Sequence, residues 1–363
     1  MSNWMSKLTK DFGLCGADVD AIANSVIKSP SPSLNWSVGN GGFPEGKAIL
    51  FYGPESGGKS LLAQLIEIAI QQKYSDGICV LIDTEFSFVK EWFIKLGGDP
   101  SRLYLRQTND PIQIFDWIEK ELQPMIKEGC PVRSIRIDSI KMIRFPKDIR
   151  EESTKLIMGG SGAAYLGSAL KGILPVIRNN KITTLFVQQV YEEMDQYKKM
   201  RNPYLIPDGR ALKHFCDLMI QVERLETKDG SIELGKTIAG GAQQIGHIVR
   251  TKTRKNRCGA PYRVAEFALD YTKGIVNVGE EIFNLGKCLD VITHPAGSSN
   301  QMWVFGNHEP IRGEENIKQW VINNPKIQEE IVAACSNVSE EVINKMNNTV
   351  KTTDMAIEGE ENA

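Results

Sequence analysis

The residues best suited to chemistry form a glycine-rich run at positions 53–60, with the sequence Gly-Pro-Glu-Ser-Gly-Gly-Lys-Ser. The run fits the pattern G-x-x-x-x-G-K-[ST], which is known as the P-loop. Glycines let successive backbone N–H groups turn towards a phosphate, and a following helix adds the positive end of its dipole. Lys59 would reach the β- and γ-phosphates of a nucleotide, and the Ser60 hydroxyl would bind Mg²⁺. The alternative is a turn that only joins a strand to a helix, and the match at every position of the pattern disfavours it.

Carboxylates at the C-terminal ends of two apolar strands are the second candidate for chemistry. Residues 80–82 lead to Asp83 and Glu85, and residues 134–137 lead to Asp138. Ligands bind at this end of the strands in open α/β sheets. Glu85 is placed to orient and deprotonate a water in line with a γ-phosphate, and Asp138 to support Mg²⁺ and its waters. Alone, Glu85 would read as a solvated turn acid, so its assignment depends on the P-loop lying in the same sheet.

A third apolar strand, at residues 183–187, ends in the amides of Gln188 and Gln189. An amide near the γ-phosphate can hydrogen-bond to it without charge repulsion, and can therefore report whether the phosphate is present. The alternative is an amide that only caps the end of the strand.

The elements that must position these groups alternate along most of the chain. Between about residues 35 and 274, short apolar runs alternate with segments of helical spacing, which indicates a largely parallel sheet covered on both faces. The expected strands are residues 48–52, 78–83, 103–105, 134–138 and 183–188, and the expected helices are residues 59–74, 89–96, 111–128 and 162–179. Residues 218–222, 246–253 and 263–269 follow without long helices between them, which predicts an antiparallel extension of the sheet.

Four parts are expected along the chain. Residues 1–34 are an N-terminal helix with a Ser/Pro-rich linker at residues 28–33, and this part is expected to pack on its own domain or on a neighbouring subunit. Residues 35–275 are a core that carries the P-loop and the strands described above, and residues 276–338 are a small C-terminal domain. In that domain, helices are expected at residues 279–285, 314–321 and 325–333, and a strand at residues 302–305. Residues 339–363 read as a flexible, mildly acidic tail.

Composition excludes several other classes of protein. The chain has 363 residues, of which 41% are hydrophobic and 24% charged, as in soluble globular proteins. No apolar run is long enough for a membrane span, and the first ten residues lack the apolar core of a signal peptide, so a cytoplasmic location is expected. The seven cysteines are scattered singly, which is typical of a reducing compartment. The net charge of −2 means that any contact with nucleic acid must come from local basic segments.

The order of these pieces resembles the RecA family of ATP-dependent strand-exchange recombinases. The likeness extends over about residues 35–325 and rests on the P-loop, the strand endings described above, Asp-Gly-Arg-Ala-Leu-Lys at residues 208–213 and Lys-Asn-Arg at residues 255–257. It implies an α/β fold with a RecA-like P-loop NTPase core, a mainly parallel central sheet with an antiparallel extension, and a small α+β C-terminal module. The divergence from the family pattern suggests a distant or phage-type member.

The resemblance also implies roles for individual residues. Lys59, Glu85 and Gln189 would be catalytic, with Glu85 as the base and Gln189 as the switch that links the γ-phosphate to a DNA-binding loop. Lys255 and Arg257 would be catalytic across the subunit interface, where they reach the neighbour's ATP like an arginine finger. ATP would be bound by Gly53, Pro54, Glu55, Ser56, Gly57, Gly58, Lys59, Ser60 and Trp92, with Trp92 beside the adenine, and Mg²⁺ by Ser60 and Asp138. The residues by themselves leave open a solvated basic turn at 255–257 and a core position for the tryptophan.

Two loops, at about residues 145–162 and 190–209, correspond to the DNA-binding loops of the family. The first has a Gly-Gly-Ser-Gly run whose backbone N–H groups can approach phosphates, and the second mixes cations with residues that stack on bases. The DNA-binding residues expected are Gly159, Gly160, Ser161, Gly162, Lys171, Lys198, Lys199, Arg201, Arg210 and Lys213. The alternative for the second loop is a disordered surface segment without function.

The function predicted is that of a DNA-dependent ATPase, with ATP and Mg²⁺ as cofactors, that forms filaments on single-stranded DNA and promotes homologous pairing and strand exchange. The partners expected are single-stranded DNA, homologous duplex DNA, further copies of the chain, and single-strand-binding and mediator proteins, but no membrane. Two alternatives stay open, namely a ring-forming helicase or motor on the same core and a non-catalytic recombination mediator that binds ATP. Because all three use the same P-loop, the P-loop cannot decide between them.

Overall fold

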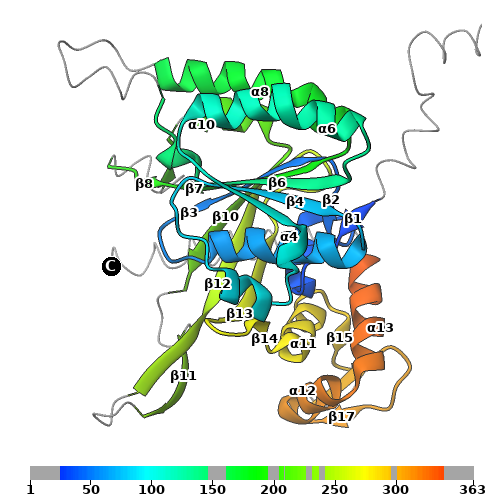
Figure 1. Cartoon of the computed structure of the whole chain (residues 1–363). Coiled ribbons are helices and arrows are strands. Elements are labelled where there is room, and N and C mark those ends of the chain that lie inside the picture. The colour runs from blue at the N-terminus through cyan, green and yellow to red at the C-terminus, as the bar shows by residue number, and fades with distance from the viewer. Residues whose placement is uncertain are drawn as a thin grey trace, which may run out of the picture.

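A central β-sheet organises the chain (Figure 1). The computed structural model describes residues 25–145, 161–194, 204–207, 209–225, 231–236, 242–295 and 301–338. In this part of the chain the central sheet has ten strands in the order β14-β13-β12-β10-β3-β7-β6-β4-β5, with β11 paired to β12 outside that path. Their bounds are β3 Ala48–Gly53, β4 Ile78–Asp83, β5 Leu103–Gln107, β6 Val132–Asp138, β7 Thr183–Gln189, β10 Leu218–Arg224, β11 Ser231–Lys236, β12 Ala242–Asn256, β13 Val264–Asp270 and β14 Gly274–Val276.

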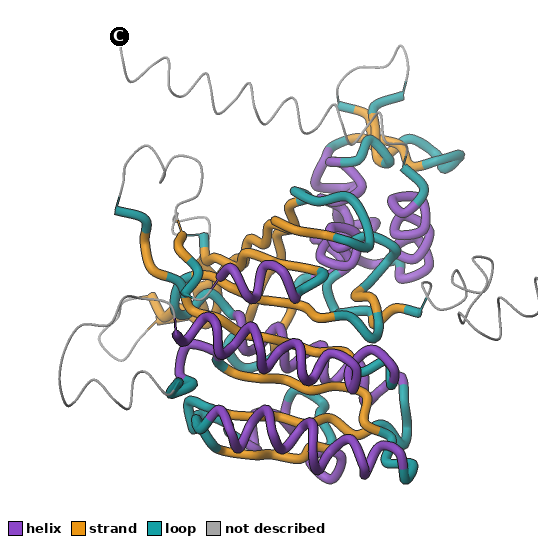
Figure 2. The backbone as a smooth tube through the Cα atoms, turned by 90° about the horizontal axis from the view of Figure 1, so that it is seen from above, coloured by secondary structure: helices purple, strands orange, loops and turns teal. Residues whose placement is uncertain are grey.

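Helices cover both faces of the parallel part of this sheet (Figures 1 and 2). On one face lies α4 (Lys59–Lys73), and on the other lie α8 (Ser161–Asn179), α10 (Gly209–Phe215) and a helical segment made of η2 (Ile112–Asp116), η3 (Ile118–Leu122) and α6 (Gln123–Lys127). Successive residues of β3 point to opposite faces, so Leu50 shares a core with Leu170 of α8, and Phe51 shares one with Ile66 of α4. The predicted α/β fold with a mixed sheet is confirmed.

The point at which the sheet turns antiparallel differs from the prediction. The strand at residues 218–222 was expected in the antiparallel extension, but β10 runs parallel to β3, with Leu218 opposite Ile49. The antiparallel part begins one strand later, where β12 pairs with β10. The reason is that the chain between β7 and β10 includes α10 and returns to the starting edge of the sheet, so β10 enters in the same direction as its neighbour.

The C-terminal module lies beside the β13–β14 end of the sheet (Figures 1 and 2). It contains α11 (Val278–Cys288), α12 (Glu314–Asn323) and α13 (Pro325–Ser336), with a small sheet of β15 (Ile292–Thr293), β16 (Met302–Phe305) and β17 (Ile311–Arg312). These helices and β16 lie where the sequence predicts them. The module has a core of its own, in which Phe283, Trp303 and Ile331 are buried.

The segment at residues 28–33 is part of the folded structure, with Ser29, Ser31 and Ser33 buried and Lys28 and Pro30 exposed, and so is not the flexible linker that its Ser/Pro pattern suggested. It leads from β1 (Val26–Ile27), which pairs with β2 (Phe43–Pro44), into α3 (Pro32–Val38). Ser31 caps this helix by accepting a hydrogen bond from the N–H of Leu34, and Pro32 occupies the first helical position. Oε1 of Glu281, on α11, accepts hydrogen bonds from the Ser31 hydroxyl at 2.6 Å and from the N–H of Ser33 at 2.7 Å. The alternation of Ser and Pro is therefore a helix start that ties the N-terminal segment to the C-terminal module.

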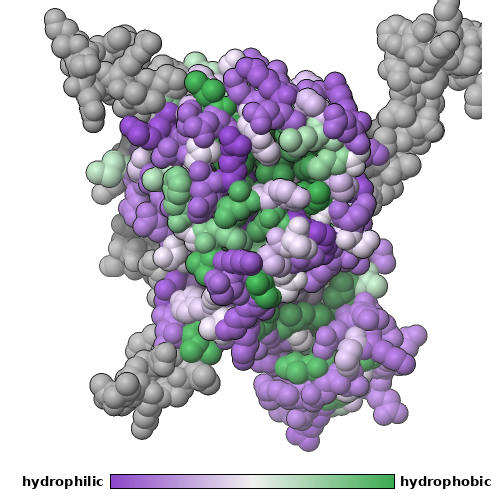
Figure 3. All heavy atoms as spheres, in the orientation of Figure 1, coloured by the Kyte–Doolittle hydropathy of each residue, from purple (hydrophilic) through white to green (hydrophobic). Residues whose placement is uncertain are grey.

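Apolar side chains also reach the surface. Figure 3 shows hydrophobic residues across the middle of the face in view, between the polar outer helices and the C-terminal module. Among the described residues, Tyr104 and Leu105 of the edge strand β5 and Ile112 at the start of η2 are exposed. Within the same residues, the structure has no helix that is both long enough and apolar enough to span a bilayer.

Candidate nucleotide-binding site

The loop between β3 and α4 packs so closely on its neighbours that glycine is required. Gly53 has a φ of +155°, and a Cβ at this position would lie 2.0 Å from the carbonyl oxygen of Val222 on β10. Gly58 has a φ of +93° and precedes the first residue of α4, and a Cβ there would lie 3.2 Å from Cδ2 of Leu269. A side chain at position 53 would therefore force the loop away from β10, and position 58 requires a backbone conformation that residues other than glycine rarely adopt.

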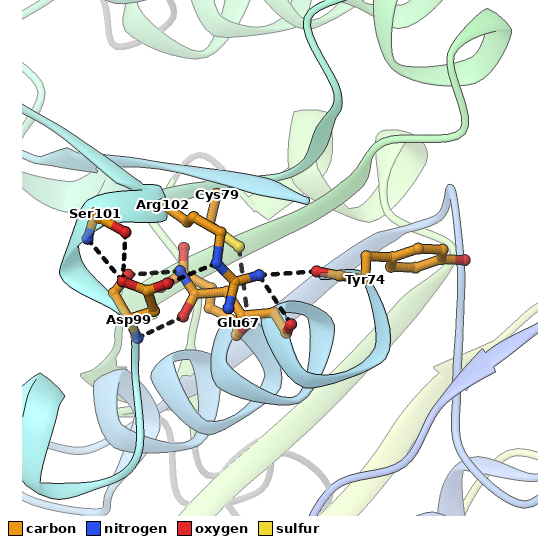
Figure 4. Close-up of polar contacts among 7 residues, drawn as sticks. Glu67, Tyr74, Cys79, Asp99, Ser101 and Arg102 are labelled. Atoms are coloured by element: carbon orange, nitrogen blue, oxygen red, sulfur yellow. Dashed lines mark hydrogen bonds and ion pairs between the residues drawn. The ribbon is translucent and has the colours of Figure 1, made fainter. Parts of the chain in front are cut away.

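The other end of α4 is held by Arg102 (Figure 4). Its Nη1 donates to the carbonyl oxygens of Gln71 at 2.9 Å and Tyr74 at 2.8 Å, and its Nε donates to Asp99 Oδ2 at 2.7 Å. The last carbonyls of a helix lack partners within the helix, so a guanidinium at this place satisfies them and complements the helix dipole. The helix that follows the P-loop is thus anchored at both ends.

Ser60 and Asp138 meet at the N-terminal end of α4. The Ser60 hydroxyl donates to Oδ1 of Asp138 at 3.2 Å, and Asp138 lies at the C-terminal end of β6, adjacent to β4 and β7. The described residues hold no cluster of three or more His, Cys, Asp or Glu side chains suited to a metal. A hydroxyl with one carboxylate fits Mg²⁺ in particular, because this ion keeps several waters and is commonly bound by one or two carboxylates together with substrate phosphates.

Burial shifts the pKa values of two charged groups at this end of α4, Lys59 and Asp138. The Lys59 ammonium is buried and donates to the carbonyl oxygen of Pro54 in its own loop at 2.5 Å. Burial lowers the pKa of Lys59, although the carboxylates of Asp138 and Glu85 act in the opposite direction. Burial also raises the pKa of Asp138, while Arg136 and the Ser60 hydroxyl lower it. Both groups therefore lie in a site of low dielectric, where a charged ligand interacts strongly.

Glu85 and Gln189 are brought together, as the sequence predicts, because β4, β6 and β7 are neighbours in the sheet. Oε1 of Glu85 accepts a hydrogen bond from the Ser139 hydroxyl at 2.5 Å, and the amide Nε2 of Gln189 lies 3.5 Å from the same oxygen. The ammonium of Lys141 donates to Oε1 of Gln189 at 2.9 Å. The side chains of three strand ends thus form one continuous polar chain.

A cleft of about 510 Å³ opens over this chain. One wall is formed by Glu55, Ser56, Gly58, Lys59, Ser60, Glu85 and Gln189. Leu269, His247 and Tyr271, from the antiparallel part of the sheet and the turn that follows β13, also line the cleft. Nδ1 of His247 lies 3.2 Å from the hydroxyl of Tyr271, and the buried Nε2 of His247 has no hydrogen-bond partner among the described residues. The cleft is therefore lined by the P-loop, by Glu85 and Gln189, and by aromatic side chains from the antiparallel part of the sheet.

Trp92 does not line this cleft. It lines a smaller cavity of about 220 Å³ on the other side of Ser60, together with Phe88, Val89 and Asp138. The two cavities share Ser60, so the tryptophan lies within the region of the P-loop but apart from Glu85 and Gln189.

Lys255 and Arg257 also lie outside the cleft of their own chain. Lys255 is opposite Met219 in the pairing of β12 with β10, near the starting edge of β10, whereas the P-loop follows the other end of the parallel strands. Its ammonium donates to the carbonyl oxygens of Cys216, at 2.5 Å, and of Lys213. Arg257 is half exposed, and its Nη1 lies 3.7 Å from Asp217 Oδ1. Both cations are docked at the C-terminal end of α10.

The expected DNA-binding residues fall into two groups. Lys171 on α8 and Arg210 and Lys213 on α10 are exposed, and the two helices are in contact. Ser161 and Gly162 begin α8, but their side chains are outside the described part of the structure. Gly159, Gly160, Lys198, Lys199 and Arg201 also lie outside the described residues. At the base of the second loop, β8 (Tyr191–Glu192) pairs with β9 (Tyr204–Leu205).

Several residues around the cleft were not identified from the sequence. Ser139 directly follows Asp138, so its position after an apolar strand was a signal for a role. Lys141, His247 and Tyr271 had no comparable signal, because a lone polar residue near a strand end has many ordinary explanations until its spatial neighbours are known.

Comparisons with known proteins agree with this geometry. Residues 3–276 match the family model of the RecA N-terminal domain. The chain is 30% identical over 334 residues to Protein RecA of Porphyromonas gingivalis, which covers 90% of this chain and 89% of that protein. It is 28% identical over 339 residues to Protein RecA of Aquifex pyrophilus, a match that covers 92% of this chain and 90% of that protein. It is 29% identical over 308 residues to Protein RecA of Staphylococcus aureus, a match that covers 85% of this chain and 81% of that protein. With this match over most of its length and the P-loop, Glu85 and Gln189 gathered at one edge of a mixed sheet, the chain belongs to the RecA family.

Proposed function

We propose that the chain is a DNA-dependent ATPase that assembles on single-stranded DNA and exchanges strands with a homologous duplex. The observation that supports this most is the hydrogen-bonded chain Ser139–Glu85–Gln189, in which Glu85 and Gln189 line the P-loop cleft. A carboxylate held there beside an amide suits the hydrolysis of a γ-phosphate and the sensing of its presence. Members of the RecA family are ATPases that act in DNA recombination and repair.

Within one subunit, the P-loop would bind the phosphates of ATP. Backbone N–H groups of residues 53–60 and the N-terminus of α4 would face the phosphates, and Lys59 would leave its present carbonyl partner to reach them. Ser60 and Asp138 would hold Mg²⁺, which neutralises part of the phosphate charge when bound. Glu85 would orient the attacking water and accept its proton, while Gln189 would hydrogen-bond the γ-phosphate. Trp92 would contact the adenine from the smaller cavity.

Between subunits, Lys255 and Arg257 would reach the nucleotide of a neighbour. They are not among the residues that line the cleft of their own chain, and Arg257 is half exposed. A cation supplied by a neighbouring subunit stabilises the charge that develops on the transferred phosphoryl group, and it makes hydrolysis depend on assembly. Contacts that repeat head to tail in this way generate an extended assembly unless the rotation closes a ring.

DNA would bind on the side of α8 and α10. The exposed cations Lys171, Arg210 and Lys213 would contact the phosphate backbone, together with the loops at residues 145–162 and 190–209. Gln189 precedes the second loop directly, so a change in its contacts with the γ-phosphate would pass to the DNA-binding segment. The binding of ATP and the binding of DNA would then be linked through Gln189.

The test is to measure ATP turnover with and without single-stranded DNA, for the wild type and for Glu85→Gln, and to image the protein with ATP and DNA by electron microscopy. We expect stimulation by DNA, a loss of turnover in the variant, and helical filaments. Absence of both stimulation and filaments contradicts the proposal. Closed hexamers would instead indicate a ring-forming motor, and turnover that is undetectable and unaffected by Glu85→Gln would indicate a non-catalytic mediator.

A further inference from the structure

A buried ion pair lies directly behind the proposed Mg²⁺ site. Nε of Arg136, on β6, lies 2.9 Å from Oε2 of Glu67 on α4, and the two side chains are 3% and 0% exposed. Ser60 and Glu67 are seven residues apart on α4 and so share one face of the helix, while Arg136 and Asp138 are two residues apart on β6 and share one face of the strand. The periods of the helix and the strand therefore bring all four residues to one place between α4 and the sheet.

Arg136 also contacts both residues proposed to hold Mg²⁺. Its Nη1 lies 3.3 Å from Oδ2 of Asp138 and 3.3 Å from the carbonyl oxygen of Ser60. The other carboxylate oxygen of Asp138, Oδ1, accepts the hydrogen bond from the Ser60 hydroxyl. Each oxygen of Asp138 therefore has one donor, and these two contacts fix the plane of the carboxylate.

Stability alone does not account for such a pair. Two charges removed from water lose hydration energy that their mutual attraction often fails to recover, and an apolar pair of similar volume is frequently as stable or more so. Burial raises the pKa of Glu67 in spite of the guanidinium beside it, and Nη2 of Arg136 is buried without a hydrogen-bond partner among the described residues. Leucine or valine would fill this position between a helix and a sheet at lower cost, so the charges call for a role beyond packing.

We propose that Arg136 is a positioning residue that orients Asp138 towards Mg²⁺, and that Glu67 is the counter-ion that holds the guanidinium in place. This inference rests on the proposed function, in which Ser60 and Asp138 hold the ion. Glu67 keeps Arg136 anchored to α4, so that the guanidinium steers Asp138 without pairing with it so tightly that the carboxylate is neutralised. The residues that surround metal ligands commonly set affinity in this way, and losing them costs about 10–100-fold in metal affinity or activity.

The variant that tests this is the double replacement Arg136→Leu/Glu67→Leu. Removing both charges leaves the net charge of the site unchanged and avoids an isolated buried carboxylate, which would destabilise the fold strongly. The measurement is the upward shift in melting temperature that ADP produces in the full chain, titrated with Mg²⁺. We expect the double variant to fold, to need about 10-fold more Mg²⁺ for half of the shift, and to keep its wild-type affinity for ADP without Mg²⁺.

A second variant and a control keep the result unambiguous. Arg136→Lys retains the charge, but a single ammonium cannot contact Glu67, Asp138 and Ser60 together, so it too is expected to need more Mg²⁺. The control is Lys73→Met/Glu45→Met, which removes an ion pair of 2.5 Å from the far end of α4 and should leave the Mg²⁺ titration unchanged.

The outcomes separate this inference from the function on which it rests. If the wild type shows a Mg²⁺-dependent shift with ADP but both Arg136 variants titrate like it, the positioning role is refuted while the nucleotide site stands. If the wild type shows no shift with ADP at any Mg²⁺ concentration, the nucleotide site itself is wrong. A change in the control pair equal to that in the Arg136 variants would show that the effect comes from α4 as a whole, and would also refute the positioning role.

Discussion

The ammonium of Lys141 donates a hydrogen bond to Oε1 of Gln189 at 2.9 Å and lies 4.9 Å from the centre of the Tyr191 ring. The contact fixes which way the amide of Gln189 faces, since its oxygen is held by the lysine and its Nε2 is left on the side of Glu85. Lys141 thus joins the floor of the nucleotide cleft to β8, at the base of the second proposed DNA-binding loop.

Replacing Lys141 by methionine should therefore reduce ATP turnover in the presence of DNA. A hydrogen bond with a charged donor contributes about 1.5–3 kcal/mol, so losing the one that orients Gln189 is expected to lower kcat about 10-fold. Binding of ADP should stay close to that of the wild type, because Lys141 does not line the cleft. Steady-state kinetics with single-stranded DNA and ADP titration check this, with Lys120→Met, an exposed cation on η3, as the control. Unchanged kcat in Lys141→Met would mean that Gln189 does not need this partner.

Ser139→Ala removes the donor that lies 2.5 Å from Oε1 of Glu85. A carboxylate that acts on a water must be held in one orientation, so we expect kcat to fall by about 10-fold while KM for ATP changes little. The comparison of kcat with KM at fixed DNA concentration is the measurement. A rise in KM with constant kcat would place Ser139 in substrate binding and not in the orientation of Glu85.

The position of Lys255 and Arg257 predicts a result for mixed proteins. Lys255→Ala/Arg257→Ala and Glu85→Gln should each be inactive alone, because every cleft then lacks either the cations or the base. In an equimolar mixture, about a quarter of the interfaces would combine an intact cleft with intact cations from the neighbour, so part of the turnover should return. The ATPase rate is measured against the mixing ratio. If no mixture exceeds the sum of its components, the two cations do not act across an interface.

Glu281 predicts a dependence of stability on pH. Burial raises the pKa of Glu281, against the hydrogen bonds from Ser31 and Ser33. An acid whose pKa is raised by folding contributes stability that is fully present below its unfolded pKa and is lost as the pH rises through its folded pKa. Relative to Glu281→Gln, which keeps an acceptor oxygen but cannot ionise, the wild type should therefore lose stability as the pH rises above 4.5, the ordinary pKa of a glutamate. Urea unfolding of both proteins at several pH values is the measurement, and a constant difference in unfolding free energy would contradict the assignment.

The central elements were predictable from local pattern alone. The helix at residues 59–74 and the strand at 48–52 follow from the spacing of apolar residues, and they are observed as α4 and β3 with ends within one residue. The direction of β10 was not predictable in this way, because its first five residues are all buried, and so short an apolar run does not show whether the strand pairs in parallel or antiparallel with its neighbours. The segment at residues 28–33 was wrongly predicted to be a linker, again because its local pattern fits more than one structure. Ser-Pro repeats are common in linkers, and only the burial of Ser31 against Glu281 shows that here they begin a helix.

The P-loop motif and the fold class are visible in the sequence, since both depend on residues that are contiguous or that repeat with the period of a helix or a strand. The polar groups that surround Glu85 and Asp138 are visible only in the folded chain. The partners of Ser139, Lys141 and Arg136 are Glu85 after β4, Gln189 on β7 and Glu67 on α4, and these partners are distant along the chain. A buried charge needs a partner close to it. Which residue becomes that partner depends on how the helix packs on the sheet, and the sequence around the charge does not show this.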